Sequence, residues 1–210
     1  PSTSPGITHE VEPAALPERV SIPDDFGLFG PLVEEANMAS SAASVSADGR
    51  FVAFQSDADN LVPGDFNSAT DVFVQDRLTG SVVRISTDFF GNDGFGPSRN
   101  PQITADGRRV VFESDAPNLV GGDANGATDI FVHDRLSSNT QRISVNSDGA
   151  EGNFSSVRPS ISEPFGQFIA FDSDADNLVD GDTNSVRDVF VRDRFNLTTE
   201  RVSVDSDGTQ

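Results

Sequence analysis

One pattern with the composition of a metal-binding loop occurs three times: a glycine and an aspartate, an asparagine two positions later, and a second aspartate four positions after that. Carboxylate and amide oxygens at short spacings are the ligands that calcium takes in protein loops. The sequence therefore predicts calcium binding, and the candidate ligands are Asp65, Asn67, Asp71, Asp123, Asn125, Asp129, Asp182, Asn184 and Asp188. The same side chains also suit Asx-turns, in which they bond to nearby backbone, and recurrence does not decide between the two interpretations.

Groups for covalent or acid–base catalysis are scarce. The chain has no cysteine, its 14 basic residues are all arginine, and its only histidines are His9 and His133. The counterparts of His133 in the other copies of the repeat are Gln75 and Arg192, so we expect a surface side chain there. We predict no catalytic residue, and calcium is the one cofactor that the sequence suggests.

The composition excludes several classes of protein. With 34 acidic against 14 basic residues, the net charge of the 210-residue chain is −20, which makes a nucleic-acid-binding surface untenable. No apolar run is long enough to cross a bilayer as a helix. Such an acidic surface stays hydrated in salt, and we expect a periplasmic or secreted protein.

The loops belong to a repeat of 58 or 59 residues, since Asp65 to Asp123 is 58 positions and Asp123 to Asp182 is 59. Within each copy, short runs of β-branched and aromatic residues are bounded by Gly, Asn, Asp or Pro, which predicts four strands in a meander. Sheets that are apolar on both faces must be covered on both faces, and stacked copies of a four-stranded sheet around an axis form a β-propeller. The predicted fold is all-β: three four-stranded antiparallel blades and one extra outer strand near residues 18–21. Equivalent phenylalanines are expected to be buried: Phe54, Phe112, Phe171, Phe73, Phe131 and Phe190.

Two charged positions also recur in every copy. An aspartate precedes an arginine at the end of the third strand, and we expect this carboxylate to pair with an arginine of a neighbouring blade (Asp76, Asp134 and Asp193). The fourth strand carries an arginine that we expect in inter-strand ion pairs at the surface (Arg84, Arg142 and Arg201), each contributing about 0–1 kcal/mol.

The repeat resembles that of the TolB-type β-propellers. The resemblance rests on Pro101–Arg108 (PQITADGR), Val110–Asp115 (VVFESD) and Asp129–Asp134 (DIFVHD), with copies at 45–76 and 159–193. It implies the propeller fold but not one activity, because such propellers serve as docking platforms, periplasmic assembly factors and domains of peptidases and lyases. This sequence departs from the common repeat in its longer loop between the second and third strands.

The predicted organisation is an extended Pro-rich tail at 1–17 followed by propeller repeats at 18–210, with blades at about 44–87, 102–146 and 160–205. Three blades and one strand do not close into a ring, so we expect a protein partner or further blades to cover the terminal blade faces. The predicted function is a non-enzymatic binding or scaffolding module that presents loops to a protein partner. The alternative is the accessory propeller of a larger hydrolase or lyase whose catalytic part lies elsewhere.

Overall fold

The computed structural model describes residues 35–208, which form three four-stranded antiparallel sheets, each a meander. The prediction of an all-β fold built from blades is confirmed, while the extra strand expected near 18–21 lies outside the described residues. Among residues 35–208, no helix has the length and apolar character needed to cross a membrane.

Blade 1 consists of β1 (Ser40–Val45), β2 (Phe51–Ser56), β3 (Asp71–Asp76) and β4 (Val82–Arg84). Blade 2 consists of β5 (Ser98–Ile103), β6 (Arg109–Ser114), β7 (Asp129–Asp134) and β8 (Asn139–Arg142). Blade 3 consists of β9 (Ser156–Ile161), β10 (Phe168–Ser173), β11 (Asp188–Asp193) and β12 (Thr198–Arg201).

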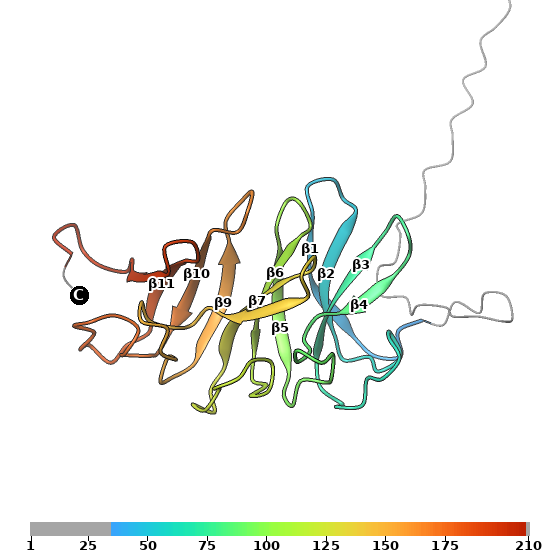
Figure 1. The fold of residues 1–210 in the computed structure, drawn as a ribbon, viewed down its shortest axis with the longest axis horizontal. Coiled ribbons are helices and arrows are strands. Elements are labelled where there is room, and N and C mark those ends of the chain that lie inside the picture. Colours follow the sequence, from blue (N-terminus) through green and yellow to red (C-terminus); the bar gives the residue numbers. More distant parts are fainter. Residues whose placement is uncertain (1–34, 209–210) are drawn as a thin grey trace, which may run out of the picture.

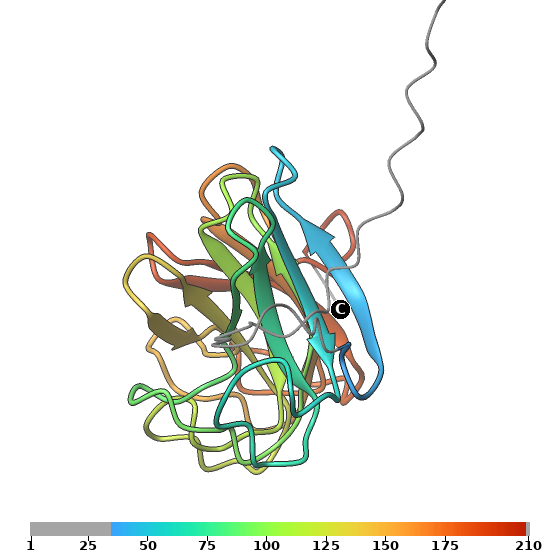
Figure 2. The same ribbon diagram turned by 90° about the vertical axis from the view of Figure 1, so that its right-hand side faces the viewer.

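The three blades lie side by side in chain order (Figure 1). Figure 2, turned by 90°, shows the sheets one behind another. The first strands of blades 2 and 3 contact the blade before them: β5 lies against β1 and β2, and β9 lies against β5 and β6. The long loops between the second and third strands of blades 1 and 2 gather at the lower edge of Figure 1, so these two loops lie on the same side of the row.

Each first strand begins four residues before the predicted blade boundary, at Ser40, Ser98 and Ser156 rather than at 44, 102 and 160. The reason is a bulge inside each of these strands, where the register with the second strand shifts. The bulges carry non-glycine residues of positive φ: Ala42, Asn100 and Arg158. A bulge interrupts the alternation of side chains between the two faces of the sheet. The alternating pattern in the sequence therefore reveals only the half of each first strand that follows its bulge.

The six equivalent phenylalanines are all buried, with exposed fractions of 0–3%, which confirms the predicted register. They form three stacked pairs between neighbouring second and third strands, with ring centroids 5.8 Å apart in blade 1 and 6.0 Å apart in blades 2 and 3. Such offset aromatic pairs add to the free energy gained from burying their apolar area. The pairs fix one rigid sheet per repeat, and the loops that carry the candidate ligands leave from the ends of these sheets.

Candidate functional site

Each Gly-Asp-x-Asn-x-x-x-Asp loop leads directly into the third strand of its blade. Its last aspartate is the first residue of β3, β7 or β11, and this carboxylate accepts a hydrogen bond from a serine hydroxyl that follows the fourth strand. The aspartate and asparagine earlier in the loop lie beside that carboxylate. The structure therefore brings the predicted ligands of each loop together.

An arginine of the fourth strand lies among these carboxylates. In blade 1, Nη1 of Arg84 is 3.1 Å from Oδ1 of Asp65 and 3.6 Å from Oδ2 of Asp71. Nη2 of Arg84 contacts the carboxylate of Asp93, which lies in the loop after β4. The side chain of Arg84 is only 5% exposed. The recurring arginines do form inter-strand ion pairs, but these are buried, and the expectation of weak surface pairs is wrong because the long loop and the loop after the fourth strand cover them.

The other two loops repeat this arrangement. Arg142 lies 3.6 Å from carboxylate oxygens of both Asp123 and Asp129, and it also contacts Glu151. In blade 3, Arg201 lies 3.1 Å from Oδ1 of Asp182 and 3.6 Å from Oδ2 of Asp188. The positive charge of a guanidinium thus offsets carboxylate charge in every loop.

The loop asparagines bind backbone groups rather than facing the centre of the loop with an oxygen. Oδ1 of Asn67 accepts a hydrogen bond from the amide two residues later, and its Nδ2 donates to Asp71 and to the carbonyl of Gly94. Asn125 and Asn184 form the same Asx-turn. These contacts are those of the turn interpretation, and calcium binding in the loops stays a prediction.

Burial raises the pKa of the first aspartate in the loops of blades 1 and 2. Desolvation raises the pKa of Asp65 to about 6, against the attraction of Arg84 and with further upward contributions from Asp71 and Asp93. The pKa of Asp123 is likewise raised to about 6 by burial and by Asp129. Asp123, Asp129 and Glu151 each offer a carboxylate oxygen within 4.8 Å of the others. Three carboxylates share one guanidinium here, so a proton or a second cation would lower their mutual repulsion.

The turn carboxylates of blades 1 and 2 pair with an arginine of their own blade, not of a neighbouring blade as expected, while Asp193 of blade 3 accepts hydrogen bonds from Gln167, which stands in place of that arginine, and from Asn196. Asp76 accepts two hydrogen bonds from Arg50, and these bonds lower its pKa to about 2. Asp134 pairs with Arg108 in the same way. The hairpin between the first and second strands brings this arginine beside the end of the third strand, a proximity that sequence spacing does not show.

The position of His133 also differs from the prediction. Its side chain is only 8% exposed, and Nδ1 lies 3.0 Å from the hydroxyl of Thr140 on β8. Desolvation lowers its pKa. All six residues of β7 are buried, because neighbouring blades cover both faces of this strand, so alternation does not expose this position.

The most unusual surface of blade 1 consists of four exposed phenylalanines, which we call the Phe loops: Phe66, Phe89, Phe90 and Phe95, which are 76–85% exposed. Phe89 and Phe90 are in edge-to-face contact, with ring centroids 5.5 Å apart. Phe66 and Phe95 line one open pocket of about 460 Å³, together with Asp88 and Asp93. Sequence analysis missed these residues. The sequence feature that could have revealed them is that the second copy of the repeat has no phenylalanine at the corresponding positions.

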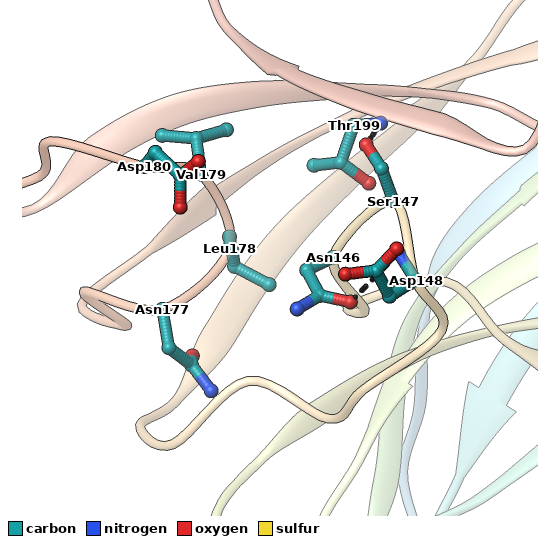
Figure 3. Close-up of a pocket in the computed structure, with 8 residues that line it drawn as sticks. All are labelled: Asn146, Ser147, Asp148, Asn177, Leu178, Val179, Asp180 and Thr199. Atoms are coloured by element: carbon teal, nitrogen blue, oxygen red, sulfur yellow. Dashed lines mark hydrogen bonds between the residues drawn. The ribbon is translucent and has the colours of Figure 1, made fainter.

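A second pocket, of about 180 Å³, lies between blades 2 and 3 (Figure 3). The loop after β8 forms one wall, where Oδ1 of Asn146 accepts a hydrogen bond from the amide of Asp148. The loop after β10 forms the other wall with Leu178 and Asp180, and Thr199 of β12 lies beside them. The hydroxyl of Ser147 accepts a hydrogen bond from the Thr199 amide. This hydrogen bond thus connects blades 2 and 3 beside the pocket.

Comparison with known proteins identifies the fold. No family model matches the chain, and no curated protein matches it. TolB from Acinetobacter baumannii is 17% identical, with a TM-score of 0.50, over 82% of this chain and 34% of that chain. A TolB-like structure from Agrobacterium tumefaciens is 19% identical, with a TM-score of 0.50, over 79% of this chain and 49% of that one. An oligogalacturonate lyase in complex with manganese is 14% identical, with a TM-score of 0.50, over 81% of this chain and 43% of that one. The chain therefore spans about a third to a half of the length of these structures, and within that span it has the fold of TolB-type β-propellers.

Proposed function

We propose that this propeller is a non-enzymatic binding module that holds a protein partner with the Phe loops of blade 1. The observation that carries the proposal is the exposure of four phenylalanines on two adjacent loops. Burying one such side chain contributes roughly 1.5–3 kcal/mol. Soluble monomers rarely leave apolar surface of this kind uncovered unless it is an interaction site.

The other blades support this interpretation, because their folds do not need these phenylalanines. In blade 2 the corresponding residues are Ala124, Ser147, Asp148 and Asn153. The loop backbone is nevertheless the same: a hydrogen bond joins residue 91 to 88 in blade 1 and residue 149 to 146 in blade 2. The aromatic side chains are thus an addition to a loop that forms without them.

The negative charge of the pocket and of the whole chain indicates the chemistry of the partner that would bind there. The pocket between Phe66 and Phe95 contains Asp88, whose pKa is lowered by hydrogen bonds from Asn92 and nearby amides despite an opposing effect of desolvation. The whole chain carries a net charge of −20. A partner segment with apolar side chains to pack on the rings and arginine or lysine to face the carboxylates complements both features.

Selection from a displayed library of random peptides tests the proposal. We expect selection on the protein to enrich peptides that combine basic and apolar residues. The matched variant carries Phe66→Ala, Phe89→Ser, Phe90→Asp and Phe95→Asn, which are the residues of blade 2. The enriched peptides should bind it at least 10-fold more weakly by titration calorimetry.

A control variant, Leu78→Ser with Leu136→Ser, removes two leucines that are 74% and 78% exposed in other turns. It should bind the peptides as the unchanged protein does. Equal enrichment on the protein and on the four-residue variant would show that the Phe loops are not the binding surface.

Two further predictions accompany the proposal. Location outside the cytoplasm is supported by the strongly acidic composition, and fractionation of cells that produce the full gene product tests it.

The alternative, an accessory propeller with its catalytic part elsewhere in a larger hydrolase or lyase, is supported by the limited span of the chain relative to the compared structures. The mass and activity of the full gene product test that alternative.

A further inference from the structure

Two phenylalanines of the Phe loops have their backbone fixed by side chains of other loops. The amide of Phe66, in the loop between β2 and β3, donates a hydrogen bond of 2.9 Å to Oδ2 of Asp93, in the loop after β4. The amide of Phe95 donates a hydrogen bond of 2.8 Å to Oδ1 of Asn118, in the loop between β6 and β7. Three loops from two blades therefore meet at this surface.

Asp93 is held in place by the same group of contacts. Its other carboxylate oxygen contacts Nη2 of Arg84, which also donates to the carbonyl of Gly64 at 3.1 Å. Its backbone carbonyl accepts a hydrogen bond of 2.8 Å from Nδ2 of Asn118. The side chain of Asp93 is only 16% exposed. The loop that carries Phe66 and the loop that carries Phe95 are thus tied together through Asp93.

The repeat contains these hydrogen bonds without the rings. One blade further along the chain, the carboxylate of Glu151 accepts from the amide of Ala124 at 3.2 Å. Oδ1 of Asn177 accepts from the amide of Asn153 at 3.0 Å, and its Nδ2 donates to the carbonyl of Glu151 at 2.8 Å. Ala124 and Asn153 are the counterparts of Phe66 and Phe95. Blade 1 therefore carries its rings at two positions whose backbone the repeat already fixes.

This arrangement orders the surface before a partner binds. Phe66 and Phe95 line the same open pocket, although they belong to different loops. Binding to a surface whose parts are already ordered costs less conformational entropy than binding to loops that must first be brought together. The relative position of the two rings, and with it the affinity for a partner, depends on the hydrogen bonds to their backbone.

We propose that Asp93 and Asn118 are positioning residues of the partner-binding surface, which hold the backbone of Phe66 and Phe95 so that both rings line one pocket. This inference rests on the proposed function of the Phe loops. It adds that blade 2 takes part in the site, although its loop at 115–128 carries no phenylalanine. Asn118 is not among the residues that line the pocket, so it acts through Phe95 and not by touching the partner.

Fluorescence anisotropy tests the proposal with the whole chain and a fluorescein-labelled copy of the tightest-binding peptide from the library selection. We expect Asn118→Ala and Asp93→Ala each to weaken binding at least 5-fold. Asp93→Glu should retain most of the affinity, because a glutamate at the corresponding position of blade 2 makes both contacts, to an amide and to an arginine. The matched control is Asn177→Ala, which removes the same hydrogen bonds one blade further along and should bind the peptide as the unchanged protein does.

Amide exchange measured by NMR separates positioning from a general loss of stability. Asn118→Ala should speed exchange of the Phe95 amide several-fold and leave the amide of Ala124 unchanged. Unchanged peptide affinity in Asn118→Ala and Asp93→Ala, while the four-residue variant of the Phe loops loses binding, would overturn this inference and leave the proposed function intact. Undiminished binding by the four-residue variant would overturn both.

Discussion

At the scale of single residues, the acidic loops depend on a positive charge that the protein supplies itself. Arg142 contacts Asp123, Asp129 and Glu151, and its side chain is only 10% exposed. Removing one partner of a buried ion pair typically costs about 3–5 kcal/mol, because the remaining charge stays desolvated and uncompensated. In EDTA at pH 7 we therefore expect Arg142→Gln to melt well below the unchanged protein.

The same variant tests the calcium prediction. Millimolar calcium should restore part of the lost stability of Arg142→Gln, since binding to the folded state alone stabilises it by about 2.7 kcal/mol at a hundredfold excess over Kd. Arg99→Gln is the matched control: Arg99 pairs with Asp115 at 3.3 Å with both side chains about 40% exposed, so its removal should cost about 0–1 kcal/mol. Coincident melting curves of Arg142→Gln in EDTA and in calcium would leave the loop aspartates with a purely structural role.

The raised pKa of Asp65 predicts a pH dependence of stability. Its pKa is about 6 in the folded protein, against an ordinary value of 3.8 for an aspartate in water. Between pH 4 and 6 the folded protein keeps a proton that the unfolded chain has lost, so the free energy of unfolding falls as the pH rises, by at most about 1.4 kcal/mol per pH unit. Urea titrations at several pH values should show that Asp65→Asn makes this fall shallower, and that the part that remains comes from Asp123, whose pKa is also about 6.

Asp76 is the natural comparison, because Arg50 lowers its pKa to about 2. Its contribution is present above pH 4 and is lost as the pH falls toward 2, so Asp76→Asn should change only the acid limb. A pH profile of Asp65→Asn parallel to that of the unchanged protein between pH 4 and 6 would contradict the assignment of the raised pKa to Asp65.

At the scale of elements, the stacked phenylalanine pairs should carry much of the stability of each blade. Phe112 is 0% exposed and stacks on Phe131 with centroids 6.0 Å apart. Its replacement by alanine opens a cavity between blades 1 and 2, and we expect a cost of about 3–5 kcal/mol in denaturant unfolding. Phe66→Ala, at a side chain that is 85% exposed, should stay within about 0.5 kcal/mol of the unchanged protein. Similar costs for the two variants would mean that Phe112 does not pack as described.

Sequence analysis could predict the blades because the repeat states the same strand pattern three times. It could not place Arg84 between Asp65 and Asp71, since only the pairing of β4 with β3 brings these residues together. It assigned His133 to the surface because the residue at this position differs among the three copies, whereas every residue of β7 is buried. The Phe loops were missed because we compared the residues that the copies of the repeat share, and the second copy has no phenylalanine at these four positions.

At the scale of the whole molecule, the row of blades should unfold unevenly. Repeat units contact only their neighbours, so the stability of each unit is set by its own fold and its interfaces. Blade 2 is covered on both faces, whereas blade 3 leaves Val189 and Val202 exposed. Hydrogen exchange followed by mass spectrometry should therefore show the slowest amides in β6 and β7 and faster exchange in β10 and β11.

A destabilising substitution in blade 3 sharpens this expectation. Phe171 is 1% exposed and packs in the cluster between blades 2 and 3. Phe171→Ala should speed exchange in β10 and β11 strongly and in β7 weakly, and it should leave β2 and β3 unchanged, because no interface of blade 1 contains Phe171. Equal acceleration in all three blades would show instead that residues 35–208 unfold as one cooperative unit, in which case the open face of blade 3 does not weaken its own blade more than the others.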